Sequence, residues 1–403
     1  MGLLDDFIKQ YNREYEYFDN HSKMIASKIE EQFSRRGIKA IITHRTKSLI
    51  SLREKIKKNN AIKKYRDTPE IFRDIKDLSA ARISLYFPLA EFVIDEIMND
   101  AFFVIEKHQP LPGKQHNVYK KKYPGYQATH YHVSLKEKDK YGQYDNSIAE
   151  VQVGSTFIHA WAEIDHELVY KPSFGKPSIK ELAMLDEVNG LALSAGLALK
   201  NLQHAMAERT IENGLASDKY ELANLLLVKI KNDIFKKNRL GDVYLLQFYL
   251  ETLDRNAFGF LLVLFKMIRP GSVLSIADQL LYMMLEKYYH PVKNPMHTYL
   301  RKLHFSNESI SLANEFIGNW VTIAGRMKKM IENDATIQFQ DMPAAFKILK
   351  KRKILTLAET AMLENLYAVK NNILHGIEIF PAVYLSNSLI TLKEIATRLS
   401  DRK

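Results

Sequence analysis

Charged and polar residues cluster in three segments of the first half of the chain, each beside a strand-like apolar run. They read DLSAARISLYF at 77–87, YKKKYPGYQATHYHV at 119–133 and EVQVGSTFIHAWAEIDHELVYK at 150–171. A fourth segment, HRTKSLISLREK at 44–55, is rich in cations. Polar residues at the ends of strands are typical of nucleotide sites, in which cations hold phosphates and carboxylates hold Mg²⁺. The four segments therefore indicate a site that handles nucleotides.

The composition restricts this chemistry further. The chain has 403 residues, 46% of them hydrophobic and 26% charged, as in folded soluble proteins. It has no cysteine, which excludes disulfides, thiolate metal sites and cysteine nucleophiles. Any metal must therefore bind carboxylates or imidazoles, which favours Mg²⁺ on oxygen ligands. The longest apolar run, 258–265, is shorter than the roughly 18–20 residues of a membrane span, and the N-terminus does not resemble a signal peptide. We expect a cytoplasmic protein that does not enter the membrane.

Secondary-structure patterns place these segments in an α+β layer. Apolar residues at helical spacing predict one or two helices over 4–36, ending near Gly37. Cations within 44–60 repeat at intervals of three and four, which predicts a third helix with several of them on one face. A helical segment is expected at 89–100, and strands are expected at 81–87, 101–108, 126–135 and 147–153. The predicted fold class is α+β, a small and mostly antiparallel sheet flanked by helices.

From Thr156 onward the chain is predicted to be largely helical. A turn signal at 213–220, with Ser217 and Asp218 as helix caps, marks the expected domain boundary. We expect an α+β domain at 1–215 and an all-α domain at 220–403, an irregular helical bundle. Residues 221–403 hold 25 Lys and Arg against 17 Asp and Glu, so most of the net charge of +11 lies there. A basic surface in this part would attract an acidic partner such as RNA, or would serve solubility alone.

Taken together, the motifs resemble the synthetase domain of the RelA/SpoT family over residues 20–200. Asp77 opens an Asp-Leu-x-x-x-Arg-Ile pattern, 122–130 is similar to the Lys-Pro-x-Gly-Tyr-x-Ser-x-His loop of the family, and Glu150 begins EVQV. Members of this family are ATP-dependent pyrophosphokinases that make (p)ppGpp. The resemblance implies a nucleotidyltransferase-like fold and an enzyme that moves the β,γ-pyrophosphate of ATP to a ribose 3′-hydroxyl. It leaves the second half of the chain unexplained.

The resemblance also implies an ATP site and a metal site. Asp77 and Glu150 would bind Mg²⁺, and Glu150 would also act as the general base for the acceptor hydroxyl. The residues expected to line the ATP site are Arg45, Lys47, Ser48 and Lys55.

The acceptor site is expected around the loop at 122–130. Tyr126 would stack on the acceptor base, while Lys122 and His130 would lie near its phosphates. Gln152 would point the same way as Glu150, because alternate residues of a strand share a face.

This chain departs from the family pattern at two places. Gly154 and Ser155 follow EVQV where an Arg-Thr pair is common, so one cation near the acceptor or its phosphates is missing. The first strand of the motif runs into Pro88, and no counterpart follows for a second arginine that packs on adenine in many members. Both departures bear on the acceptor and on ATP affinity more than on the reaction type.

Three hypotheses for function stay open at this point. The acceptor is GDP or GTP, giving (p)ppGpp, or it is the 3′ end of tRNA, as in toxic members of the family, with 220–403 controlling the enzyme. In the third, the chain is an inactive family member whose helical domain is a binding module. The presence of Lys47, Asp77, Tyr126 and Glu150 weighs against inactivity. A regulatory ligand or protein at 220–403, and a homo-oligomer, are further candidate partners.

Other motifs have simpler interpretations. Trp161 is expected in the core, and His159 and His166, seven apart on one helical face, are expected to pack or hydrogen bond rather than bind metal. Within 364–377, Lys370, Asn371 and His375 resemble part of the Arg-Asn-x-x-x-His element of HEPN ribonucleases. A histidine at a helix end beside a glycine is the commoner reason for such a pattern.

Overall fold

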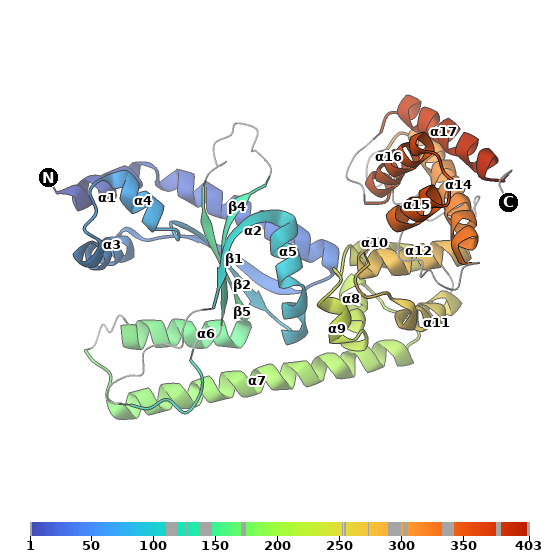
Figure 1. Cartoon of the computed structure of the whole chain (residues 1–403). Coiled ribbons are helices and arrows are strands. Elements are labelled where there is room, and N and C mark those ends of the chain that lie inside the picture. The colour runs from blue at the N-terminus through green and yellow to red at the C-terminus, as the bar shows by residue number, and fades with distance from the viewer. Residues whose placement is uncertain are drawn as a thin grey trace. The chain divides into compact units, whose positions relative to one another are not determined.

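The computed structural model describes residues 2–109, 119–125, 128–136, 147–170, 175–251, 253, 255–272, 274–288, 300, 305–332, 342–375 and 380–400. The described part divides into two compact units, Met1–Ala207 (unit 1) and Glu208–Lys403 (unit 2). The division falls within the long helix α7 (Ile179–Glu212) (Figure 1). We keep 1–215 and 220–403 as the proposed limits of the functional domains.

Within the described residues, unit 1 is built on one five-stranded sheet with the strand order β1-β2-β5-β4-β3 (Figure 1). Strands β2 and β5 pair in parallel, and the other neighbours pair antiparallel. The prediction of a mostly antiparallel sheet flanked by helices is therefore confirmed. The strands are β1 (Ala40–Thr46), β2 (Ser79–Leu85), β3 (Phe102–His108), β4 (Thr129–Leu135) and β5 (Ala149–Ser155).

One face of the sheet is largely apolar and packs against helices α2 (Tyr15–Arg36) and α5 (Ile94–Ala101). Side-chain hydrogen bonds connect these helices to the strands. The Ser79 hydroxyl donates to Phe18 O at 2.9 Å, and the Tyr131 hydroxyl donates to Asp95 Oδ1 at 2.7 Å. The fully buried core side chains on this face include Ile83, Val133 and Val151. Burial of these side chains from water is the main stabilising contribution to unit 1.

The opposite face of the sheet, called the polar face below, carries the candidate chemistry. Paired residues of neighbouring strands point to the same side of a sheet, so the strand register shows which side chains lie together on this face. Its charged and polar members include Arg45, Arg82, Glu106, His108, His130, His132, Glu150 and Gln152. Helix α6 (Thr156–Asp165) packs against β2 and β5 on this side.

Three short helices form a second apolar cluster beside the sheet. They are α1 (Leu3–Arg13), α3 (Leu49–Lys63) and α4 (Thr68–Asp74), joined through Phe7, Tyr11, Leu52 and Ile71. The predicted end of the N-terminal helices near Gly37 is confirmed, since Gly37 ends α2 with a left-handed φ of 66°. The remaining elements of unit 1 are the 3₁₀ helix Pro88–Val93 and the π-helical turn His166–Tyr170.

The predicted helix over 44–60 is wrong at its start. Residues up to Thr46 belong to strand β1, and α3 begins only at Leu49. The β-branched residues of β1 pair antiparallel with β2 from Ala40 opposite Leu85 to Thr46 opposite Ser79. The spacing of the cations imitates a helix, but pairing with a buried strand decides the local structure.

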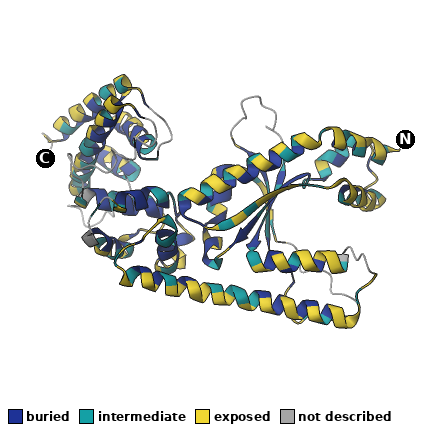
Figure 2. Cartoon of the chain, turned by 180° about the vertical axis from the view of Figure 1, so that it is seen from behind, coloured by how far each residue is buried: buried dark blue, intermediate teal, exposed yellow. Residues whose placement is uncertain are grey.

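Helix α7 is, among the described residues, the one helix long and apolar enough to cross a membrane by length and composition. Its buried polar side chains include those of Asp186, Asn189 and Gln203, which form hydrogen bonds with other parts of unit 1. Figure 2 shows exposed positions along much of its length, with buried positions at intervals. These contacts are those of a helix that packs against protein.

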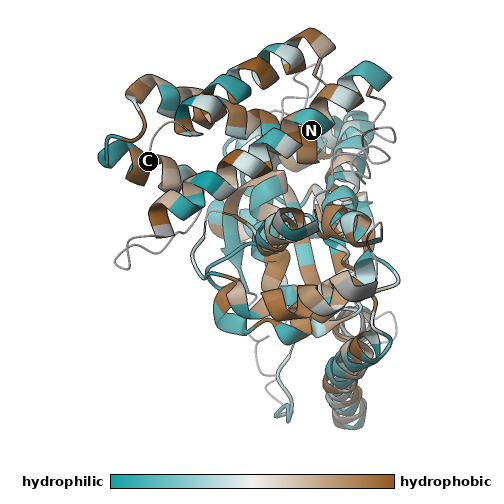
Figure 3. Ribbon diagram, turned by 90° about the vertical axis from the view of Figure 1, so that its right-hand side faces the viewer, coloured by the Kyte–Doolittle hydropathy of each residue, from teal (hydrophilic) through white to brown (hydrophobic). Residues whose placement is uncertain are grey.

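The described elements of unit 2 are helices, and each carries both polar and apolar residues (Figure 3). Asp218 caps the first of them, accepting hydrogen bonds at 2.8 Å from Tyr220 N and Glu221 N, as predicted. Trp320 and Phe346 lie in its core. After the end of α7 the helices are α8 (Lys219–Lys229), α9 (Asn232–Phe235), α10 (Val243–Glu251), α11 (Arg255–Leu264), the 3₁₀ turn Phe265–Met267, α12 (Ile276–Tyr288), α14 (Asn307–Glu332), α15 (Met342–Lys351), α16 (Leu357–His375) and α17 (Ala382–Ser400).

Candidate active site

Two lysines converge on the carboxylate of Asp77, just before β2. Lys47 follows β1, and its backbone is held by a hydrogen bond from its N–H to Leu78 O (3.1 Å) and one from the Tyr11 hydroxyl to its carbonyl (2.6 Å). Lys47 Nζ donates to Asp77 Oδ2. Lys55 Nζ, from α3, lies 3.0 Å from the same oxygen. Three of the predicted residues therefore form one group.

Burial and the two lysines act on Asp77 in opposite directions. Burial alone would raise the pKa of Asp77, but the positive charges of Lys47 and Lys55 hold that pKa below its usual range. The carboxylate is therefore ionised at neutral pH. Its other oxygen, Oδ1, is buried and has no hydrogen-bond partner among the described residues. A buried anionic oxygen without a partner is unfavourable, so Oδ1 is suited to bind a cation.

Glu150 lies on β5 between two side chains that fix its carboxylate. Its Oε1 is 3.1 Å from His130 Nδ1, and its Oε2 accepts a hydrogen bond of 2.7 Å from Gln152 Nε2. His132 is paired with Glu150 across the strands and brings Nε2 to 3.9 Å from Oε1. Burial would raise the pKa of Glu150, but the hydrogen bond and charge of His130, helped by Gln152 and His132, lower the pKa to about 2. Glu150 is thus an oriented anion at neutral pH.

Arg82 was not among the predicted site residues, although it stands in the Asp-Leu-x-x-x-Arg-Ile pattern. It forms an ion pair with Glu163 of α6, and its Nε is buried without a hydrogen-bond partner in the described part of the chain. Burial would raise the pKa of Glu163, but Arg82 and, more weakly, Arg45 lower it. Arg45 therefore lies near this pair, on the exposed strand β1. The register of Arg82 opposite Gln152 places it beside the Glu150 group.

A search against protein-family models matched residues 44–174 to a family described as a region found in RelA and SpoT proteins. This segment is a RelA/SpoT domain. The match covers Lys47, Lys55, Asp77 and Glu150, and it confirms the resemblance that the motifs predicted. A search of curated proteins gave no match.

Solved structures similar to the chain include three with bacterial sources. Small alarmone synthetase 1 from Bacillus subtilis is 20% identical with a TM-score of 0.40, over 49% of this chain and 98% of that one. The same synthetase bound to its product pppGpp is 19% identical with a TM-score of 0.39, again over 49% and 98%. A GTP pyrophosphokinase family protein from Streptococcus pneumoniae is 16% identical with a TM-score of 0.40, over 54% and 97%.

Asp186 of α7, which follows the matched segment, holds the loop at 119–125. Its Oδ2 accepts hydrogen bonds from Lys122 N (2.6 Å) and the Tyr119 hydroxyl (3.1 Å), and its Oδ1 accepts one from Tyr123 N (3.3 Å). The Asp186 side chain is buried, whereas Lys122 and Tyr123 are exposed. One helix residue thus fixes the backbone just before the predicted acceptor residues.

Two further α7 residues complete this contact. Asn189 Nδ2 donates to Pro124 O at 2.6 Å. Gly190 leaves room for the ring of Tyr123, because a Cβ at this position would lie 2.6 Å from two ring carbons. Sequence reasoning missed both residues, since nothing in the motifs connects α7 with a loop some 65 residues earlier.

The structure places the predicted acceptor residues in different surroundings. His130 and Gln152 flank Glu150, while Lys122 is exposed on the loop that Asp186 holds. Tyr126 lies outside the described residues. Ser48, predicted at the ATP site, is the N-cap of α3 and accepts a hydrogen bond from Ser51 N at 3.3 Å.

The residues of the domain fit a magnesium ion by their chemistry. Mg²⁺ prefers carboxylate oxygens, and Asp77 offers a buried oxygen without a partner. Glu150 offers a second ionised carboxylate on the parallel neighbour of β2. The register places Glu150 beside Ala80, three residues after Asp77, so the two carboxylates lie toward the same end of the two strands.

Trp161 and His159 have packing roles, whereas His166 does not. Trp161 is buried, as predicted, and its Nε1 donates to Leu185 O at 3.0 Å. His159 is buried, with Nε2 3.1 Å from Ile83 O, whereas His166 is exposed on the π-helical turn. The two histidines therefore differ in burial, and the regular helix ends at Asp165 between them.

In unit 2 the ribonuclease-like element is explained by burial. Lys370 is fully buried, with Nζ 4.0 Å from the ring centroid of Tyr282 and 4.3 Å from that of Tyr367. His375 Nε2 lies 3.2 Å from Asp278 Oδ1. A lysine enclosed by two aromatic rings is not placed to bind the phosphates of an RNA strand, so these residues belong to the contact between α12 and α16.

Proposed function

We propose that the chain is an ATP-dependent pyrophosphokinase that transfers the β,γ-pyrophosphate of ATP to the ribose 3′-hydroxyl of GDP or GTP. The family match supports pyrophosphokinase activity of the (p)ppGpp type in general. The observation that carries the proposal is the group at Asp77, where two lysines hold one carboxylate oxygen and the other is left for a cation. Such a group supplies phosphate-binding cations and a metal ligand side by side.

In this proposal ATP changes the partners of the two lysines. The triphosphate carries more negative charge than the Asp77 carboxylate, so Lys47 and Lys55 would turn from Asp77 Oδ2 to the phosphates. Arg45 and Ser48 lie at the end of β1 and the start of α3, and would complete the ATP site. Asp77 would then be free to bind Mg²⁺. The ion, when bound with ATP, supplies the charge that stabilises the transferring phosphates.

Glu150 would serve mainly as a second metal ligand. A general base works best when its pKa is near the working pH, and a pKa of about 2 gives Glu150 little driving force for taking a proton. Its fixed orientation between His130 and Gln152 suits ligation, which needs an ionised and positioned oxygen. The acceptor nucleotide would lie by His130 and the loop that Asp186 holds, with its base on Tyr126.

The second candidate acceptor is the 3′ end of tRNA. The charge of residues 221–403, 25 Lys and Arg against 17 Asp and Glu, favours it, because each neutralised RNA phosphate releases counterions. In that case the labelling rate should fall steeply as salt is raised. With a free nucleotide the dependence should be modest. A cytoplasmic location, a homo-oligomer, and a regulatory ligand or protein at 220–403 remain part of the proposal.

The experiment that tests the proposal compares charge-neutral variants of matched acidic residues. Full-length wild type, Asp77→Asn and Glu150→Gln would be incubated with Mg²⁺, GDP and ATP labelled in the γ-phosphate. Each variant should lose on the order of 10²–10⁴-fold in turnover, because it removes a ligand of the same ion. Glu187→Gln, an exposed position on α7, should be unchanged. Turnover in Glu150→Gln equal to that in Glu187→Gln would refute the assignment.

A further inference from the structure

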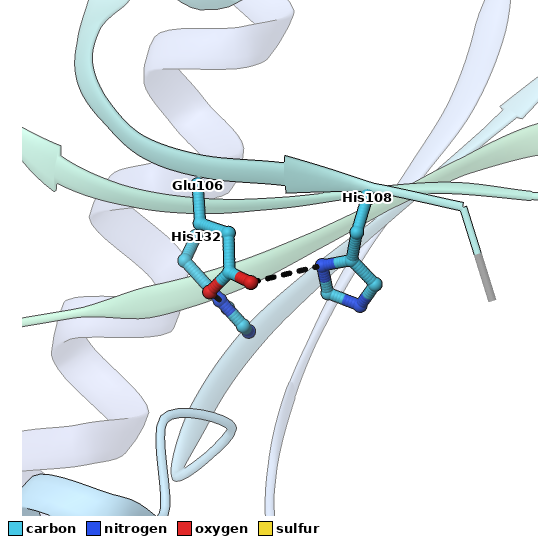
Figure 4. Close-up of side chains that lie close together, drawn as sticks. All are labelled: Glu106, His108 and His132. Atoms are coloured by element: carbon cyan, nitrogen blue, oxygen red, sulfur yellow. Dashed lines mark hydrogen bonds and ion pairs between the residues drawn. The ribbon is translucent and has the colours of Figure 1, made fainter.

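A group of imidazole and carboxylate side chains lies at the edge of the polar face, beside the site described above. Glu106, His108 and His132 each offer one ligand atom, and these atoms all lie within 4.8 Å of one another. His132 Nδ1 is 3.0 Å from Glu106 Oε2, and His108 Nδ1 is 4.0 Å from Glu106 Oε1. Figure 4 shows both rings directed toward the Glu106 carboxylate.

The sheet builds this group through a β-bulge in β3. The register between β3 and β4 shifts between Val104 and Glu106. After the shift, Glu106 is opposite His132 and His108 is opposite His130, so Glu106 and His108 face the polar side. Without the shift, Ile105 rather than Glu106 would lie opposite His132, and Lys107 rather than His108 would lie opposite His130. Bulges of this kind re-aim side chains and are common next to active sites.

The donor set and its spacing suit a transition-metal dication. Imidazole nitrogens and a carboxylate oxygen bind Zn²⁺ at about 2.0–2.2 Å, which in a tetrahedral site separates the donors by roughly 3.3–3.5 Å. The present separations of 3.0 and 4.0 Å lie on either side of that value. Strand β3 is at the edge of the sheet, and the Glu106 side chain is 50% exposed, which leaves room for a water ligand. Lys76 Nζ, 3.8 Å from Glu106 Oε2, is the neighbouring cation that an ion would have to displace.

We propose that Glu106, His108 and His132 bind a divalent transition-metal ion such as Zn²⁺. The site is separate from Asp77 and Glu150, the carboxylate pair proposed for Mg²⁺. Mg²⁺ itself would bind poorly to the imidazole ligands of the new site. The new site also touches that pair, because His132 binding through Nδ1 points Nε2 at Glu150 Oε1, now 3.9 Å away. The second nitrogen of a metal-bound histidine usually donates to a carboxylate, and here that contact would orient Glu150.

The test measures binding of Zn²⁺ alone to the full-length protein after treatment with a chelator. Titration against a chromogenic chelator should show one tight site per chain that millimolar Mg²⁺ does not displace. His108→Gln, which removes a partly exposed ligand, should weaken binding at least tenfold. His166→Gln is the matched control, because His166 also has a glutamate nearby, with Nδ1 3.4 Å from Glu167 Oε1, and should bind as wild type does.

Substitution with Co²⁺ provides a second measurement that does not depend on the affinity. Wild type should show the visible absorption bands of Co²⁺ in a tetrahedral site, and His108→Gln should lose these bands. Equal Zn²⁺ affinity in wild type and His108→Gln would overturn the proposal. Binding that survives in His108→Gln but is lost in Glu150→Gln would also overturn it, since the ion would then belong to the magnesium site. Both readouts are independent of pyrophosphokinase activity.

Discussion

Asp186 gives the most specific prediction, because this single side chain connects α7 to the acceptor loop. We expect Asp186→Ala to release the backbone at Lys122 and Tyr123 and to leave the Lys47, Lys55 and Asp77 group in place. Three hydrogen bonds are lost, at 2.6, 3.1 and 3.3 Å. Acceptor use should therefore fall while ATP binding is nearly unchanged.

The size of the effect follows from the geometry of the three bonds. A hydrogen bond to a charged group contributes about 1.5–3 kcal/mol, and the shortest of the three, to Lys122 N, should lie near the upper end. The bond to Tyr123 N is long, and water can replace the bonds to Lys122 N and Tyr123 N because both residues are exposed. We therefore expect the substitution to cost about 2–4 kcal/mol, less than the sum of three full hydrogen bonds. If roughly half of this appears in acceptor binding, the KM for the acceptor rises about 5–30-fold. Asp186→Asn keeps one acceptor oxygen and should show a smaller rise.

Two measurements check this prediction, with Glu187→Ala as the control at the adjacent exposed position. Steady-state kinetics should show the KM for the acceptor raised in Asp186→Ala and the KM for ATP within about twofold of wild type. Hydrogen exchange at the amides of Lys122 and Tyr123 should become faster, whether or not the variant is active. Exchange and acceptor KM indistinguishable from those of Glu187→Ala would refute the reasoning. An equal rise in both KM values would show that Asp186 is purely structural.

Further predictions concern packing and ionisation. Gly190→Ala should lower the free energy of unfolding by about 1–3 kcal/mol, because its Cβ would meet the Tyr123 ring at 2.6 Å, whereas Gly196→Ala, with open space on the same helix, should not be destabilising; chemical denaturation compares the two. The pKa of Glu150, about 2, is below its ordinary value of 4.5, so Glu150 contributes stability above about pH 4.5 that is lost as pH falls toward 2. His130→Gln should reduce this acid-dependent loss, and an unchanged acid profile would contradict the assigned cause. Burial lowers the pKa of Lys370 well below 10.5, so this group lowers the free energy of unfolding of unit 2 at pH values below 10.5. The loss becomes smaller as the pH rises toward 10.5. Lys370→Met should therefore slow hydrogen exchange in α16 at neutral pH, whereas the exposed Lys347→Met should not; faster exchange in Lys370→Met would show that the contacts of the amine with Tyr282 and Tyr367 outweigh its burial.

The sequence predicts the parts of the fold that depend on local pattern. The strands β2, β4 and β5, the end of α2 at Gly37 and the cap at Asp218 follow from residue type and spacing. Strand β1 could not be predicted in this way. The cations within 44–60 imitate one continuous helix, and only pairing with β2 makes the residues up to Thr46 a strand.

The candidate site shows the same limit. The motifs mark Asp77 and Glu150 because each stands at a recognisable position in a family pattern. They do not show that Lys47 and Lys55 share one oxygen of Asp77, because this depends on how α3 meets the end of β1. Asp186 and the Glu106 group are invisible in the sequence, since one depends on helix packing across about 65 residues and the other on a bulge in β3.

The fate of the phosphates of ATP tests the central claim most directly. Full-length protein would be incubated with Mg²⁺ and γ-labelled ATP, with GDP, GTP or tRNA as acceptor, and every labelled and unlabelled product would be identified by mass spectrometry. Transfer of the β,γ-pyrophosphate predicts AMP in equal amount with an acceptor that carries the label on a 3′-pyrophosphate, and we expect the guanine nucleotides to be the acceptors. Label on tRNA alone would keep the reaction and reverse the choice of acceptor. Formation of ADP with a singly phosphorylated acceptor or free phosphate would contradict the pyrophosphokinase assignment.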